Sequence, residues 1–162
     1  MDYKKLTKPY QNDLLKDLYR FVEIPSVYER KSVSANKPYG KNVDKALSAF
    51  ASFGKEHGFK VERNPHYVEL SYGNQGPIIG IYGHLDVVPV QDPKIFKIRT
   101  ANNNLYGRGV ADDKGPLLAA TYAVIALKEK GLIKNAQIKI FAGGNEERGS
   151  SCLIRYAKTH AA

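Results

Sequence analysis

Two stretches in the first part of the chain place apolar side chains at helical spacing. Residues 10–22 carry them on one face, and Pro25 stands where it would stop a helix. Residues 43–57 repeat the pattern, and Gly58 is suited to end that helix in a left-handed conformation. The intervening residues 25–40 lack this periodicity, so the sequence predicts two helices joined by a loop.

Strand patterns follow the second helix. Residues 59–63 and 67–72 alternate between apolar and polar, as half-buried strands do. Residues 78–82 form a compact apolar run, which is typical of a central strand buried on both faces. A short hairpin is predicted from residues 96–100 and 105–106.

The last part of the chain alternates between helix and strand. Residues 117–130 are rich in Ala and Leu, with Pro116 suited to a first helical position and Gly131 able to close the helix. A strand over residues 137–142 then leads to a helix that begins near Gly149.

The order of these elements indicates the fold class. Strands that alternate with helices from residue 78 onward predict an α/β fold, with a mixed, mainly parallel sheet and helices on both faces. Ligands bind such sheets at the carboxyl ends of the strands. A chain of 162 residues is one domain or a piece of a larger one.

Composition narrows the function classes. The formal charge of +9 would suit a nucleic-acid-binding protein, but the basic residues are scattered and never exceed two in a row, so we expect no nucleic-acid partner. No apolar segment approaches the roughly 20 residues of a membrane span, so no membrane partner is expected. Cys152 is the single cysteine and no apolar signal core is present, which together predict a cytoplasmic protein.

Three short segments carry candidate chemistry, and each lies at a predicted strand end. His84 and Asp86 follow the first apolar run, where a carboxylate could accept the second N–H of the imidazole and favour metal binding by its other nitrogen. Asp112 lies in a Gly-rich turn before a helix. Glu146 and Glu147 are adjacent, and a cation would relieve their repulsion.

Each segment alone also has a simpler interpretation. His84 and Asp86 could be a solvated strand exit, Asp112 a helix-start acid, and the Glu pair a solvated turn. Chance does not readily explain three such clusters at three strand ends of a basic chain. Together they predict metal binding combined with proton transfer.

The segments GHLDVVP, LYGRGVADDKGP and GGNEERGS closely resemble the dinuclear zinc amidohydrolases. That family includes PepV-type dipeptidases, carboxypeptidase G, aminoacylases, acetylornithine deacetylase and succinyl-diaminopimelate desuccinylase. The segments ADDKGP and GGNEERGSS look most like the PepV-type branch, which cleaves Xaa-His or β-Ala-Xaa dipeptides. The resemblance implies a zinc-exopeptidase-like catalytic domain, a small peptide substrate and two divalent metals, namely zinc, with manganese or cobalt as alternatives.

The resemblance also implies a role for each matching residue. His84 would bind one metal, Asp112 would bridge both, and Glu147 would bind the second. Glu146 would be the general base for the attacking water, and Asp86 would orient His84. The peptide bond after Asp112 would be cis.

The sequence departs from the family pattern in its ligand count. The family uses five metal-binding side chains, of which His84, Asp112 and Glu147 match; His160 lies in a different context and is not assigned. Residues 1–162 are therefore expected to form the N-terminal part of a metallopeptidase catalytic domain, inactive alone, without the lid or dimerisation domain and the second half of the catalytic domain. The strand over residues 137–142 would then lie at an unprotected sheet edge.

Three functions remain open on the sequence alone. The first is dipeptide hydrolysis by the complete protein. The second keeps the family but changes the reaction to deacylation of N-acyl amino acids or to carboxypeptidase action. The third is a non-catalytic remnant or pseudoenzyme. Oligomeric state is not predicted.

Overall fold

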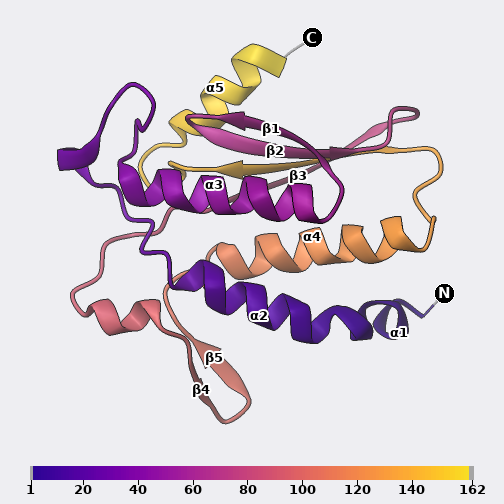
Figure 1. Cartoon of the computed structure of the whole chain (residues 1–162), viewed down its shortest axis with the longest axis horizontal. Helices are drawn as coiled ribbons and strands as arrows, with labels where there is room; N and C mark the ends of the chain where they lie inside the picture. Colours follow the sequence, from indigo (N-terminus) through magenta and orange to yellow (C-terminus); the bar gives the residue numbers. More distant parts are fainter. Residues whose placement is uncertain (1, 161–162) are drawn as a thin grey trace.

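The computed structural model describes residues 2–160, which form one mixed sheet with helices on both of its faces, and a small separate hairpin (Figure 1). The helices and strands in chain order are α1 (Tyr3–Thr7), η1 (Lys8–Tyr10), α2 (Gln11–Val22), η2 (Arg30–Ser32), α3 (Lys41–Glu56), β1 (Lys60–Asn64), β2 (Tyr67–Tyr72), β3 (Ile78–His84), η3 (Pro93–Phe96), β4 (Arg99–Ala101), β5 (Asn104–Tyr106), α4 (Lys114–Glu129), β6 (Gln137–Gly143) and α5 (Ser151–His160).

The main sheet has the strand order β1-β2-β6-β3. Strands β1 and β2 form a hairpin, and β2 pairs with β6, both antiparallel; β3 pairs with β6 in parallel through the crossover that contains α4. The predicted mixed α/β sheet is confirmed. Parallel pairing is confined to β3 and β6 within the described residues, a smaller share than the sequence pattern indicated.

The helices cover the sheet in layers. Figure 1 shows α3 and α4 on one face, α5 beyond the other, and α2 on the side of α4 that faces away from the sheet. Aromatic side chains join α2 to α3, because Phe21 meets Phe50 and Phe53 edge-on at ring-centroid distances of 6.1 Å. These three side chains are completely buried, so the core lies between the sheet and the helices.

Two expectations about the sheet were wrong. Strand β6, expected at an edge, is paired on both sides, whereas β3, expected in the centre, forms an edge of the described sheet. Its Ile78, Ile79 and Tyr82 are 58%, 50% and 61% exposed. An apolar run has the same composition whether or not both of its edges are paired, so periodicity alone could not separate these cases.

Several local features also differ from the expectation. Helix α1 and the turn η3 were not predicted, and α4 begins at Lys114, before Pro116. At the start of α4, the Lys114 side chain is buried and donates hydrogen bonds to the carbonyls of Phe21 (2.9 Å) and Ile24 (2.7 Å). Burial lowers the pKa of Lys114 to about 7, against the opposing effect of the negative charge of Asp86. The side chain therefore ties the end of α2 to the start of α4.

Five apolar side chains of β3 and α5 are exposed, and this set is here called the β3–α5 surface. It consists of Ile78, Ile79, Tyr82, Leu153 and Ile154. Tyr82 links the two elements, since its ring lies 6.3 Å from that of Tyr156 on α5. An unpaired strand edge with apolar side chains is prone to pair with another chain.

We expect the isolated 162-residue chain to self-associate through the β3–α5 surface. The double variant Ile78→Lys/Ile154→Lys should shift it toward monomer in size-exclusion chromatography with light scattering, because two ammonium groups oppose close contact. Val33→Lys is the matched control, since Val33 is 43% exposed and lies outside this surface. A similar shift with the control would show that net charge, and not this surface, governs association.

Candidate metal centre

The parallel pairing of β3 and β6 brings the candidate residues together. His84 is the last residue of β3 and lies opposite Gly143, the last residue of β6. Glu146 and Glu147 follow in the turn after β6, which we call the 144–150 turn. The carboxyl ends of parallel strands meet at the same edge of the sheet, where α/β folds bind ligands.

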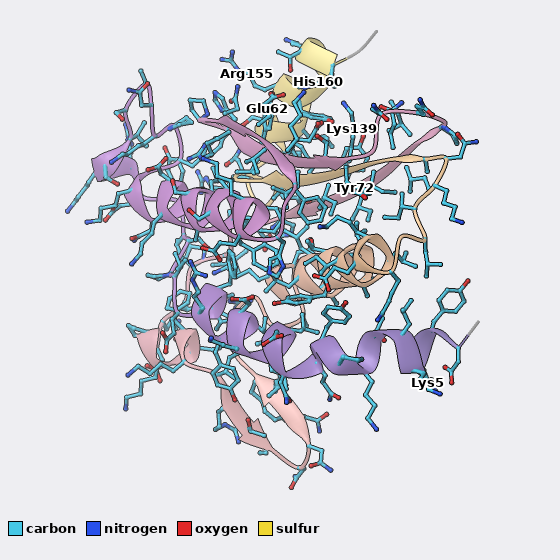
Figure 2. The ribbon with its side chains drawn as sticks, turned by 45° about the vertical axis from the view of Figure 1, so that its right-hand side comes forward. Lys5, Glu62, Tyr72, Lys139, Arg155 and His160 are labelled. Atoms are coloured by element: carbon cyan, nitrogen blue, oxygen red, sulfur yellow. The ribbon has the colours of Figure 1, made fainter. Side chains whose placement is uncertain are left out.

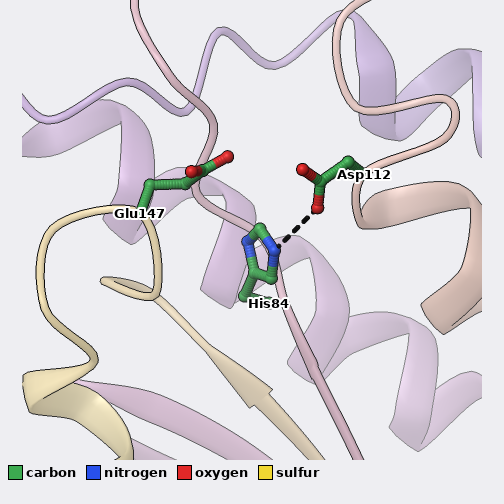
Figure 3. Close-up of side chains that lie close together, drawn as sticks. All are labelled: His84, Asp112 and Glu147. Atoms are coloured by element: carbon green, nitrogen blue, oxygen red, sulfur yellow. Dashed lines mark hydrogen bonds and ion pairs between the residues drawn. The ribbon is translucent and has the colours of Figure 1, made fainter.

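His84, Asp112 and Glu147 converge at this edge (Figure 3). One ligand atom from each lies within 4.8 Å of the other two, and His84 Nε2 is 3.1 Å from Asp112 Oδ1. An imidazole nitrogen and two carboxylates suit zinc and also manganese or cobalt. The donor set therefore fits a divalent cation, and the structure brings together the three residues expected to bind one.

His84 is held with its Nε2 toward the carboxylates. Its Nδ1 lies 3.0 Å from the backbone oxygen of Asp86 and 3.5 Å from the Asp86 carboxylate. Asp86 therefore lies beside His84 as expected, but the closer contact is made by its backbone carbonyl. Such an acceptor keeps a proton on Nδ1, so Nε2 is the nitrogen that would bind a metal, in exchange for its own proton.

The Asp86 carboxylate also binds the 144–150 turn, which the sequence did not indicate. Its two oxygens accept the backbone N–H groups of Glu146 (3.0 Å) and Glu147 (3.1 Å). Asp86 is only 4% exposed, so these bonds lie away from solvent. A single carboxylate thus links the exit of β3 to the 144–150 turn.

Asp113 is a further site residue that sequence reasoning missed. It had no assigned role beyond the cis peptide bond after Asp112, but its carboxylate accepts the backbone N–H of His84 at 3.0 Å. A Cβ atom at Gly83 would lie 2.5 Å from Asp113 Oδ2, so this strand position requires glycine. A glycine next to the last residue of an apolar strand was the available signal. The expected cis bond between Asp112 and Asp113 is confirmed.

The charges around the centre favour a cation. Burial raises the pKa of Glu147, and the negative charge of Asp112 raises it further. Burial is also the main cause of the raised pKa of Asp113. Burial acts to lower the pKa of His84, but hydrogen bonds and negative charge from Asp86 outweigh it and raise that pKa to about 9. A cation between these groups would relieve the carboxylate repulsion.

Glu146 lies beside the three candidate ligands His84, Asp112 and Glu147 but is not one of them. Its Oε2 is 3.8 Å from His84 Nε2, and its side chain is exposed. Glu146, His84 and Asp112 line a cavity of about 340 Å³ whose apolar wall includes Phe141 and Leu153. A carboxylate that reaches both solvent and the metal ligands is placed to exchange protons with a small bound molecule.

His160 does not belong to this site. Figure 2 shows it on α5, next to Glu62 of β1, and its Nε2 lies 3.2 Å from a Glu62 oxygen. Its ring stacks on Tyr156 with centroids 4.2 Å apart. These contacts agree with the sequence interpretation, which left His160 unassigned.

Comparison with known proteins places the chain in a family. The sequence profile of peptidase family M20/M25/M40 matches residues 80–161, which is just over half of the chain and includes every candidate site residue. The chain belongs to this family. The donor set of His84, Asp112 and Glu147 is consistent with membership of a metallopeptidase family.

The M20 chain is similar to bacterial dipeptidases in sequence. It is 36% identical over 165 residues to the Beta-Ala-Xaa dipeptidase of Lactobacillus delbrueckii subsp. lactis, covering 98% of this chain and 35% of that protein. It is 32% identical over 154 residues to a putative dipeptidase of Bacillus subtilis (strain 168), and the match covers 91% of this chain and 33% of that protein. The chain thus spans about a third of the length of these relatives.

Solved structures support the fold. Human carnosine dipeptidase 1 matches with a TM-score of 0.78 and 24% identity, over 98% of this chain and 38% of that one. The Saccharomyces cerevisiae dipeptidase Dug1p matches with a TM-score of 0.78 and 23% identity, over 98% of this chain and 37% of that one. In residues 2–160 of the M20 chain, no helix combines the length and apolar character needed to cross a membrane.

Replacing Asp86 with Asn tests its link between the two strand ends. We expect Zn²⁺ affinity to fall by about 10–100-fold, as for other residues that orient metal ligands. We also expect the free energy of unfolding to fall by about 1.5–3 kcal/mol, because Asn has one acceptor oxygen and leaves one of the two backbone N–H groups without a partner. Isothermal titration and urea unfolding measure the two effects.

The control for this variant is Asp92→Asn. Asp92 is exposed, and its carboxylate also accepts a backbone N–H, from Lys94 at 2.9 Å. It should leave Zn²⁺ affinity unchanged. Unchanged affinity in Asp86→Asn would contradict the role given to Asp86.

Proposed function

We propose that this M20 chain is the N-terminal part of the catalytic domain of a metal-dependent dipeptidase. The substrate would be a small dipeptide of the β-Ala-Xaa or Xaa-His kind, cleaved at its amide bond. The observation that carries the proposal is the convergence of His84, Asp112 and Glu147 at the ends of β3 and β6, with Glu146 beside them. The similarity to the Beta-Ala-Xaa dipeptidase of Lactobacillus supports the substrate class.

The proposed metals are two divalent cations, zinc in the first place. His84 and Asp112 would hold one, and Asp112 and Glu147 the other, because the Asp112 carboxylate lies within reach of both partners. Manganese and cobalt suit the same nitrogen and oxygen donors. Bound divalent metal would polarise the scissile carbonyl and make water a better nucleophile at neutral pH.

The proposed general base is Glu146. Its exposed carboxylate would take a proton from the attacking water and return it to the leaving amine. Asp86 would keep the Glu146 backbone and the His84 ring in register through its backbone and carboxylate oxygens. The apolar wall of the 340 Å³ cavity would receive a substrate side chain.

The rest of the catalytic unit would complete the centre. A catalytic zinc usually has three protein ligands and an open position, whereas the described residues offer two for each metal, with Asp112 counted twice. The relatives are about three times as long as this chain. We propose that their additional length corresponds to a second half of the catalytic domain that pairs with β3, covers the β3–α5 surface and supplies the missing ligands, and to a lid or dimerisation domain.

Other parts of the proposal follow from composition. Cys152 is a buried free thiol, which suits a reducing compartment such as the cytoplasm. The scattered arrangement of basic residues gives no support to a nucleic-acid partner. Deacylation of N-acyl amino acids, carboxypeptidase action and a non-catalytic remnant are the competing functions.

Metal binding by the 162-residue chain is the first test. Wild type should bind Zn²⁺ in isothermal titration, and Asp112→Asn and Glu147→Gln should each weaken binding by about 10-fold or more, since each removes an anionic ligand. Glu23→Gln, at an exposed position on the end of α2, is the charge-matched control and should bind as wild type does. Equal loss in all three variants would reject the assigned ligands.

Turnover by the whole polypeptide that contains these residues is the second test. β-Ala-Xaa and Xaa-His dipeptides should be hydrolysed faster than N-acyl amino acids. Glu146→Gln should lower kcat by about 100-fold or more, because general acid–base catalysis contributes about 100- to 10,000-fold, while bound metal content stays unchanged. Faster hydrolysis of N-acyl amino acids would favour the deacylase. Absence of turnover with both substrate classes would favour the non-catalytic remnant.

A further inference from the structure

A chain of hydrogen bonds runs from the 144–150 turn into the β1–β2 hairpin. Asn145, the buried residue before Glu146, donates from Nδ2 to Ser151 Oγ at 2.8 Å and to the Arg148 carbonyl at 3.2 Å. Ser151 Oγ lies 3.0 Å from the Tyr39 hydroxyl, which lies 2.7 Å from His66 Nδ1. We call the side chains of Asn145, Ser151, Tyr39 and His66 the Tyr39 chain.

The hydrogen bonds of the Tyr39 chain run in one direction. The Asn145 amide can only donate to Ser151, so we assign the next two bonds in the same direction, from Ser151 to Tyr39 and from Tyr39 to His66 Nδ1. This arrangement gives the Asn145 amide and the Ser151 and Tyr39 hydroxyls an acceptor each, and it requires a neutral His66 imidazole. Burial, with a smaller contribution from the positive charge of Arg155, lowers the pKa of His66 and favours that neutral form.

Backbone contacts anchor both ends of the Tyr39 chain. The N–H of Gly144 donates to the His66 carbonyl at 3.1 Å, and the N–H of His66 donates to Asn64 Oδ1 at 3.0 Å. The Tyr39 ring also packs on the turn, since a Cβ atom at Gly144 would lie 3.1 Å from Tyr39 Cδ2. The β1–β2 hairpin therefore supports the start of the turn through its backbone and through Tyr39.

The Tyr39 chain and Asp86 hold the same turn at different groups. Asp86 binds the N–H groups of Glu146 and Glu147, whereas the Tyr39 chain binds the side chain of Asn145, the residue before them. A turn that carries two repelling carboxylates needs such restraint to keep them in place for a metal. Sequence patterns gave Tyr39 and His66 no role, because one lies in the loop of residues 25–40 and the other in a hairpin turn.

We propose that Tyr39 is a positioning residue for the metal centre, which acts through Ser151 and Asn145 on the turn that carries Glu146 and Glu147. His66 acts in turn through the Tyr39 hydroxyl. This inference rests on the proposed function for its effect on metal binding, but the ordering of the turn can be measured without any metal.

The first experiment is Tyr39→Phe in the 162-residue chain, which removes the hydroxyl and keeps the ring. Zn²⁺ affinity in isothermal titration should fall by about 10-fold, in the range seen when supporting partners of metal ligands are removed. Tyr122→Phe is the matched control, because Tyr122 is also buried and its hydroxyl donates to Asp17 at 2.6 Å, outside the metal centre. It should lower the urea midpoint to a similar extent and leave Zn²⁺ affinity unchanged.

A double variant tests whether His66 acts through Tyr39. His66→Ala should weaken Zn²⁺ binding, and Tyr39→Phe/His66→Ala should be no weaker than Tyr39→Phe alone, because the hydroxyl that His66 fixes is already gone. Additive losses would overturn the serial arrangement. Wild-type affinity in folded Tyr39→Phe, or an equal loss in Tyr122→Phe, would overturn the role of Tyr39.

Amide hydrogen exchange of the metal-free chain separates this inference from the proposed function. The Glu146 and Glu147 amides should exchange faster in Tyr39→Phe than in Tyr122→Phe, whether or not the site binds metal. If wild type fails to bind Zn²⁺ and this difference persists, the metal site is wrong and the positioning of the turn stands. Equal exchange in the two variants would reject the positioning role.

Discussion

A single buried carboxylate, that of Asp86, holds the candidate centre together. It accepts the N–H groups of Glu146 and Glu147 and lies 3.5 Å from His84 Nδ1, so it joins the ends of β3 and β6 at the point where ligands converge. A buried charge is tolerated only when it is paired or hydrogen-bonded, and Asp86 has both kinds of partner. The spacing of the metal ligands therefore depends on this contact, which constrains the 144–150 turn while leaving the Glu146 side chain exposed to solvent.

The turn before α4 acts as a second point of attachment. Asp112 faces the centre, Asp113 accepts the N–H of His84, and Lys114 donates to the carbonyls at the end of α2. Three consecutive side chains thus contact three different parts of the fold. The Tyr39 chain adds a contact from the β1–β2 hairpin, so the centre is supported by most of the described sheet.

Sequence patterns could predict the helices and the convergence of the three motifs, because both follow from periodicity and from the rule that ligands bind at strand ends. They placed α2 and α3 within two residues of their observed bounds. Sequence patterns could not tell that β3 is an edge strand and β6 a central one, because apolar strands have similar compositions in both positions. They missed the bonds of Asp86 to the 144–150 turn and the contacts of Asp113 and Tyr39, because a side chain's hydrogen-bond partner is set by tertiary placement.

The compact arrangement of residues 112–114 has a consequence for how the family can vary. Surface loops usually accept insertions and deletions because few other elements depend on their register. Here an insertion or deletion of one residue would displace three side chains at once. Asp112 would leave the metal centre, Asp113 would lose the N–H of His84, and Lys114 would lose the carbonyl of Ile24. Substrate preference can therefore diverge elsewhere in the molecule, while the length of this turn is expected to stay fixed through evolution.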